Sequence, residues 1–188
     1  MRRRGAFEGE GVGLWPLVGP GLRVLFVGYN PSIPAFRAGH YYANPSNRFY
    51  ALLHMSGLTP RLLRPEEDVL LPELGIGVTD LCPTPSAMAH DLPAGCYASG
   101  ASALAALVRE HRPRVLCCNG YGVFRALLGR APSRAGLQED VRFEGVPVFA
   151  VPSSSGAASA YTAARLAAWQ ELRAWIDLPG EPDTCPPA

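Results

Sequence analysis

The chain contains no lysine, so its 17 basic side chains counted as Lys and Arg are all arginines. This excludes enzymes that form a Schiff base through a lysine side chain. The chain also has no apolar run near the roughly 20 residues that span a membrane. Its basic start, MRRR, is not followed by the apolar stretch of a secretory signal. We therefore expect a cytoplasmic protein with no membrane partner.

Metal-binding and nucleotide-binding motifs are absent as well. None of the five cysteines forms a CxxC pair, and their number is odd; they are Cys82, Cys96, Cys117, Cys118 and Cys185. This pattern predicts no zinc site, no iron–sulfur cluster and no disulfide framework, and favours buried free thiols in a reducing compartment. The sequence has no GxxxxGK, GxGxxG or G-x-S-x-G motif. We expect neither a metal nor a cofactor.

The length of 188 residues and the hydrophobic content of 48% predict one globular domain. Residues 1–20, which are rich in glycine, are expected to form an arm that packs partly through Leu14, Trp15 and Leu17. The single domain would cover residues 21–178. The proline-rich residues 179–188 are expected to be a disordered tail. A net charge of +1 neither requires nor excludes a nucleic-acid partner.

Short apolar runs alternate with helical patterns along the domain. The runs predict buried strands over 23–29, 76–81, 114–118 and 146–151. Helical spacing appears over 46–56, 99–111, 121–129 and 161–176. This alternation predicts an α/β fold, a three-layer α/β/α sandwich with a central, mostly parallel four-stranded sheet.

The strands of such a sheet end at one common edge, where open α/β sheets bind ligands. Four polar loops follow the predicted strands: GYNPS, TDLCPTPSAMAHD, NGYG and PSSSG. In the first loop, Asn30 can orient a water but cannot ionise, although Asn-Pro also commonly starts ordinary turns. Tyr41 and Tyr42 could stack on a flat base. The PSSSG loop offers hydroxyl and backbone N–H groups that suit phosphate, but serine-rich turns also occur without function.

Two of these motifs resemble a known family. GYNPS followed by GHYYANPSNRFYALLHMSGLTP is similar to the first motif region of the mismatch-specific uracil-DNA and thymine-DNA glycosylases, densely over residues 22–60. The resemblance continues thinly through GVTDL to PSSSG. It implies an enzyme that flips a base out of DNA and hydrolyses its N-glycosidic bond.

The resemblance also implies roles for individual residues. Asn30 would position the water, and Tyr42 would stack on the base. Gly28, Tyr29 and Ser32 would form the part of the pocket that recognises the edge of the base. The loop that pinches DNA phosphates would contain Ser153, Ser154, Ser155 and Gly156, followed by Ala157 and Ala158.

This chain departs from the family pattern at both motifs. Tyr29 replaces the usual aliphatic residue, which predicts a wider aromatic wall. Ala157 and Ala158 stand where a bulky or cationic residue usually fills the gap left by the flipped base. A carboxylate on the loop after the second predicted strand could assist Asn30 as a general base. The main candidate is Asp91, and the second candidate is Asp80, at the end of that strand.

The resulting hypothesis is a monofunctional DNA repair glycosylase. It would remove uracil, and in addition thymine or other damaged pyrimidines paired with guanine, from double-stranded DNA. We expect a monomer that associates with the nucleoid if the source is bacterial. Two alternatives stay open: a non-catalytic module that binds damaged DNA, and a hydrolase of free nucleosides.

Overall fold

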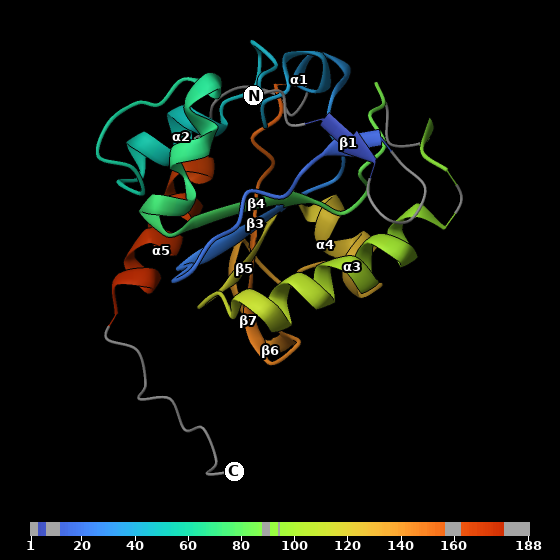
Figure 1. Cartoon of the computed structure of the whole chain (residues 1–188). Coiled ribbons are helices and arrows are strands. Elements are labelled where there is room, and N and C mark those ends of the chain that lie inside the picture. The colour runs from blue at the N-terminus through green and yellow to red at the C-terminus, as the bar shows by residue number, and fades with distance from the viewer. Residues whose placement is uncertain (1–3, 7–11, 88–90, 94, 157–162, 179–188) are drawn as a thin grey trace.

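The computed structural model describes residues 4–6, 12–87, 91–93, 95–156 and 163–178. A sheet of five strands runs through its centre (Figure 1). In spatial order the strands are β4 (Ile76–Asp80), β3 (Val24–Gly28), β5 (Leu116–Asn119), β7 (Val146–Val151) and β6 (Gly136–Phe143). The first four are mutually parallel, and β6 pairs antiparallel with β7. The predicted mostly parallel α/β sheet is confirmed, but the strand count of four is wrong.

The strand that the sequence does not reveal is the edge strand β6. Its residues, GLQEDVRF, carry charged side chains that are exposed, so they form no apolar run. A two-residue turn connects β6 to β7, and both Glu144 and Gly145 have positive φ angles of 50° and 82°. This is the backbone of the tight turns that match the twist of a β-hairpin.

Helices cover both faces of the sheet (Figure 1). On one face lie α2 (Phe49–Met55) and α5 (Ala163–Asp177), and on the other lie α3 (Cys96–His111) and α4 (Tyr121–Leu128). The short α1 (Ile33–Ala38) follows β3 and was not predicted. Helix α2 begins three residues later than predicted, because Ser46 bonds to Asn44 instead of capping the helix. Two 3-10 helices, η1 (Pro65–Leu70) and η2 (Pro72–Leu74), precede β4.

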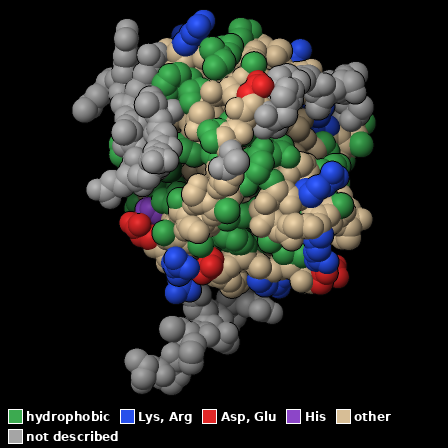
Figure 2. Space-filling model, turned by 90° about the vertical axis from the view of Figure 1, so that its right-hand side faces the viewer, with side chains coloured by type: hydrophobic (Ala, Val, Ile, Leu, Met, Phe, Trp, Pro, Cys, Tyr) green, Lys and Arg blue, Asp and Glu red, His purple; other side chains and the backbone are tan. Residues whose placement is uncertain are grey.

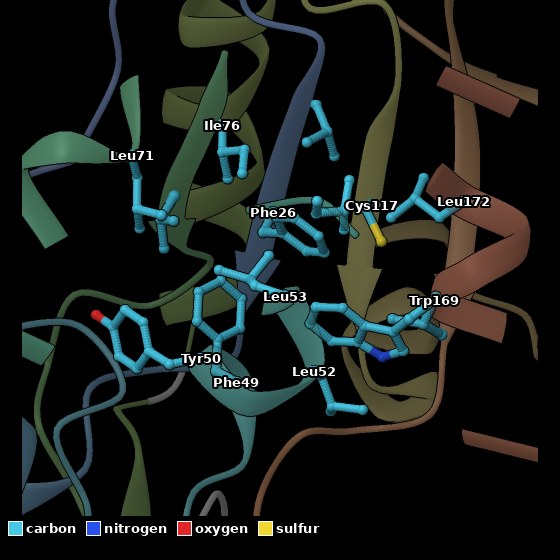
Figure 3. Packing of buried hydrophobic residues seen from close by; sticks show 14 of the residues in the cluster. Phe26, Phe49, Tyr50, Leu52, Leu53, Leu71, Ile76, Cys117, Trp169 and Leu172 are labelled. Atoms are coloured by element: carbon cyan, nitrogen blue, oxygen red, sulfur yellow. The ribbon is translucent and has the colours of Figure 1, made fainter. Parts of the chain in front are cut away.

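The larger part of the core lies between the sheet and the α2/α5 layer (Figure 3). Phe26 of β3 stacks on Trp169 of α5 with ring centroids 5.0 Å apart, and the edge of Phe49 meets Phe26 at 5.4 Å. These three rings are fully buried. Burial of aromatic side chains dominates core energetics, so this contact fixes α2 and α5 against the sheet.

The N-terminal arm contains a small hairpin of β1 (Arg4–Ala6) and β2 (Val12–Leu14). Leu14 and Leu17 are buried as predicted, and Leu17 pairs with Val78 of β4. Trp15 is 44% exposed and does not join the core. The predicted tail, 179–188, lies outside the described residues. No helix in the described part of the chain has the length and hydropathy needed to cross a membrane.

The cysteines differ from the expectation of free thiols. Cys82, just after β4, forms a disulfide with Cys96 at the start of α3. The spacing of 14 residues matches no sequence motif, so only the fold brings the two together. Cys117 and Cys118 on β5 are buried free thiols, and burial raises the pKa of both. Cys185 lies outside the described residues.

Candidate active site

The carboxyl ends of β3, β4, β5 and β7 surround a cavity of about 230 Å³. The predicted loops thus meet at one place. The residues that line the cavity are Leu14, Gly28, Tyr29, Asn30, Pro31, Ser32, Ala35, Tyr41, Tyr42, Asn44, Asn47, Asp80, Ser86, Ala87, Asn119, Ser153, Ser154 and Ser155. Most of the polar groups among them are neutral amides and hydroxyls. Such a lining suits an uncharged polar ligand.

Asn30 is held in one orientation by the loop after β4. Its Nδ2 donates to Pro31 O at 3.0 Å and to Ser86 Oγ at 3.1 Å, and it also lies 3.3 Å from Thr84 O. These contacts engage the amino side of the amide. The carbonyl oxygen, Oδ1, receives no hydrogen bond from the described residues and can accept one from a water in the cavity.

Gly28 ends β3 directly opposite Asp80, the last residue of β4. A Cβ atom at position 28 would collide with Asp80 Oδ1 and would lie 3.2 Å from the Tyr42 hydroxyl. Only glycine at position 28 therefore leaves room for both the Asp80 carboxyl and the Tyr42 hydroxyl at the floor of the cavity. Burial raises the pKa of Asp80 to about 8. The sequence placed Asp80 at the end of a strand and named it as a candidate carboxylate, but it gave no sign of this shifted pKa.

Tyr42 has one face of its ring covered. It stacks on Phe49 with centroids 3.9 Å apart and planes inclined by 22°. Its φ of 56° is left-handed, which turns the chain so that the ring lines the cavity. Burial, followed by the nearby charge of Asp80, raises the pKa of its hydroxyl, so the ring stays neutral.

The segment that carries Tyr42 is fastened by the buried Asp68 of η1. Its Oδ2 accepts from the backbone N–H of Tyr41 at 3.0 Å, and its Oδ1 lies 3.2 Å from Nδ1 of His40. The Tyr50 hydroxyl donates to Tyr41 O at 2.8 Å. His40 thus supports the loop from outside the cavity lining. Nothing in the sequence pattern indicates Asp68 as a support of this site.

Tyr29 and Ser32 also border the cavity, but their side chains are engaged elsewhere. The Tyr29 ring packs toward the α3/α4 side, 5.7 Å from the ring of Tyr97 and against Gly122. Its backbone carbonyl accepts from Cys82 N at 2.8 Å. The Ser32 hydroxyl accepts from Ala35 N at 3.4 Å and caps α1. These two residues therefore border the cavity while their side chains help to hold its walls.

The PSSSG loop is tied to the end of β5. Asn119 Nδ2 donates to Ser154 Oγ at 2.8 Å, and Ser154 N donates to Asn119 Oδ1 at 2.9 Å. Both side chains are buried, so Ser154 holds the loop in place, whereas Ser153 and Ser155 are only half-buried. Sequence reasoning nominated the loop after β5 but did not single out Asn119.

The same loop rests on the segment before α2. Arg48 N donates to Ser154 O at 2.9 Å, and a Cβ on Gly156 would come within 2.6 Å of Ser46 O. Gly156 is exposed at the rim. Ala157 and Ala158, which were predicted to follow it in contact with DNA, lie outside the described residues.

The structure separates the two candidate carboxylates. Asp80 lines the cavity, whereas Asp91 is exposed and is not part of the lining. Charged side chains of both signs are scattered over the face that Figure 2 shows, some of them as adjacent pairs of opposite charge, with hydrophobic and uncharged surface between these groups. Among the described residues, no three His, Cys, Asp or Glu side chains gather as a metal site would require.

A mostly parallel sheet between two helical layers, with a neutral polar pocket at its carboxyl edge, defines a ligand-binding α/β protein. Comparison with known families identifies the class more closely. Residues 15–178 match the model of the uracil DNA glycosylase superfamily, and the chain belongs to that family. Its general activity is therefore that of a DNA glycosylase.

A solved structure shares this fold. The solution NMR structure of a candidate uracil DNA glycosylase from Methanosarcina acetivorans superposes with a TM-score of 0.62 at 22% identity. The match covers 87% of this chain and 96% of the Methanosarcina chain. At this identity the likeness concerns the fold.

Proposed function

We propose that this protein removes uracil from double-stranded DNA by hydrolysis, using a water held on Asn30 Oδ1. The observation that supports this most strongly is the fixed Asn30 amide, whose Nδ2 is bonded to the 84–86 loop while the residue lines the cavity. Because the carbonyl oxygen of an amide accepts hydrogen bonds without being a strong base, Asn30 is suited to orient a water.

In the proposed reaction the C1′–N1 bond breaks and its electron pair stays on the base. The deoxyribose becomes oxocarbenium-like, and the Asn30-bound water adds to C1′ and releases a proton to solvent; the base anion takes up a proton from solvent and leaves as the free base. A weakly basic amide suffices, because the carbon is already electrophilic. No lysine is present to attack C1′ instead, so a lysine-based lyase step is excluded and an abasic site is the product.

The pocket would hold the flipped base against the free face of Tyr42. Phe49 supports the other face of that ring, so the stacking surface is already in place. The backbone around Gly28 and Tyr29 and the peptide before Ser32 would contact the base edge. A neutral, polar lining favours an uncharged base over a charged one.

DNA would be held at the rim by the PSSSG loop. We propose that Ser153, Ser155 and Gly156 meet the phosphates, and that Ser154 keeps the loop in position through Asn119. Contacts to phosphate from hydroxyl and backbone N–H groups position DNA without reading its sequence. Ala157 and Ala158 would follow at the gap left by the base. Because they are small, a mispaired base, which is easier to extrude, is the preferred substrate.

The test is base release from matched duplexes that contain uracil opposite guanine, uracil opposite adenine, or thymine opposite guanine. We expect release of free uracil, fastest opposite guanine. Tight binding to the uracil duplex without release at any pH would instead indicate a non-catalytic DNA-binding module. Cleavage of free deoxyuridine at a rate similar to that of the duplex would indicate a nucleoside hydrolase. Binding that weakens steeply with salt would support DNA as the partner.

A further inference from the structure

The carboxyl group of Asp80 is half-buried at the end of β4, and the proposed hydrolysis on Asn30 does not use it. Its Oδ2 is fully covered and has no hydrogen-bond partner in the described part of the chain. Its Oδ1 lies over Gly28, and the residue lines the cavity. A buried carboxylate oxygen without a donor is costly, whereas the carbonyl oxygen of a neutral acid tolerates this position far better.

Among the described residues, no positively charged side chain compensates a charge on Asp80. Its pKa is raised by burial alone, to about 8. The titratable side chains that feel its charge are Tyr41 and Tyr42, whose own pKa values are raised, so both stay neutral. The β3 residue opposite is Gly28, and α3 presents Ser99, Gly100, Ala103, Leu104 and Leu107 to the space behind Asp80. Among the described neighbours, nothing would hold an ionised carboxylate here.

We infer that Asp80 serves as a neutral carboxylic acid, with its proton on Oδ1, and donates a hydrogen bond to a carbonyl oxygen of the flipped base. This deepens the proposed function and rests on it. Oδ1 occupies the position that a side chain at residue 28 would take, next to the Tyr42 hydroxyl, and Gly28, Tyr42 and Asp80 all line the cavity that would receive the base. Oδ2 then remains the covered carbonyl oxygen.

The donor would act where charge develops during the reaction. When the C1′–N1 bond breaks, the electron pair moves onto the base and is shared with its carbonyl oxygens. A fixed donor in a site of low polarity stabilises that anion more than it stabilises the neutral substrate. The acid keeps its proton throughout, so no further reactant is needed. Ligands with a carbonyl at this edge would be preferred over those with an amino group there.

The experiment compares wild type, Asp80→Asn and Asp80→Leu in single-turnover release of uracil from the uracil–guanine duplex as a function of pH. Asp140→Asn is the matched control, because Asp140 is exposed and paired with Arg130 at 2.7 Å. The wild-type rate should fall about tenfold per pH unit above a pH of about 8, as the donor is lost. Asp80→Asn keeps an N–H donor, so its rate should stay within about tenfold of wild type and lose this fall.

Asp80→Leu should be slower than wild type by about 10²-fold below about pH 8 and should not show the fall above that pH, so the two rates converge at high pH; Asp140→Asn should follow wild type. A wild-type rate that rises with pH and vanishes in Asp80→Asn would overturn the inference, since Asp80 would then be a general base. Identical pH profiles for wild type and Asp80→Asn would overturn it as well.

Infrared spectroscopy tests the inference without activity. The wild-type minus Asp80→Asn difference spectrum at neutral pH should show a carboxylic acid carbonyl band that shifts when free uracil is added. If wild type releases no base, the proposed function fails, and this band alone decides whether Asp80 is a neutral donor. Absence of the band, or a band that free uracil leaves unchanged, would overturn the inference.

Discussion

Replacing Asp80 by asparagine should stabilise the folded protein at neutral pH while leaving it nearly unchanged in acid. The pKa of this carboxyl rises from its usual 3.8 to about 8 in the folded state, because burial disfavours the charged form. The folded protein therefore binds a proton that the unfolded chain releases. Stability contributed at this site is complete below the unfolded pKa and falls as the pH rises from about 4 to about 8.

The size of the effect follows from the same two values. One pKa unit corresponds to about 1.4 kcal/mol, and pH 7 lies about three units above the unfolded pKa. Wild type thus loses about 4 kcal/mol of unfolding free energy at pH 7 that it retains in acid. Asp80→Asn has the same shape and cannot ionise, so it escapes this loss.

Urea denaturation of wild type and Asp80→Asn between pH 4 and 8 measures this difference. The stability advantage of the variant should grow by about 4 kcal/mol between pH 4 and pH 7. A difference that is independent of pH would refute the reasoning, because Asp80 would then ionise equally in both states. The exposed Asp140→Asn, by contrast, should show no advantage that grows toward neutral pH, since its partner Arg130 lowers the pKa of Asp140.

Three further substitutions test the cavity floor, the loop after β7 and the disulfide. Gly28→Ala should lower the unfolding free energy measured in urea by about 1–3 kcal/mol, because the new Cβ meets the Asp80 carboxyl. The variant should also release no base. Full activity would contradict the contact between Gly28 and Asp80 at the floor of the cavity. Ser154→Ala leaves the buried Nδ2 of Asn119 without its acceptor, while Oδ1 keeps the backbone N–H of residue 154, and should cost about 1–3 kcal/mol. The exposed Ser102→Ala should cost less than about 0.5 kcal/mol. Cys96→Ser removes the disulfide that closes a 14-residue loop and should lower the unfolding free energy by about 3 kcal/mol. Alkylation of Cys82 in native, unreduced wild type would show that the disulfide does not exist.

The parts of the fold that are apolar in sequence could be predicted. Strand β7 has the predicted bounds, Val146–Val151, because a short apolar segment ending in four consecutive buried residues has few alternative structures. The edge strand β6 could not be predicted, since its stability comes from pairing with β7 and a tight turn at Glu144 and Gly145. Its own side chains give no apolar signal.

In the candidate site, too, some features could be predicted from the sequence and others could not. Asn-Pro after a buried strand predicted that the Asn30 side chain lies at the sheet edge, and Asn30 does line the cavity there. That Asn30 holds a water stays a prediction. The environment of Asp80 and the pairing of Ser154 with Asn119 were not predictable, because both depend on which strands become neighbours. The assistance of Asp91 stays a prediction, although the residue lies outside the cavity lining.

The most direct test of the central claim is a comparison of wild type with Asn30→Ala in single-turnover release of uracil from a uracil–guanine duplex, with DNA binding measured on the same substrate. If Asn30 holds the attacking water, the rate should be at least about 10²-fold lower in the variant, with affinity for the duplex retained. An Asn30→Ala protein that releases uracil as fast as wild type would contradict it, because the water would then be held by another group.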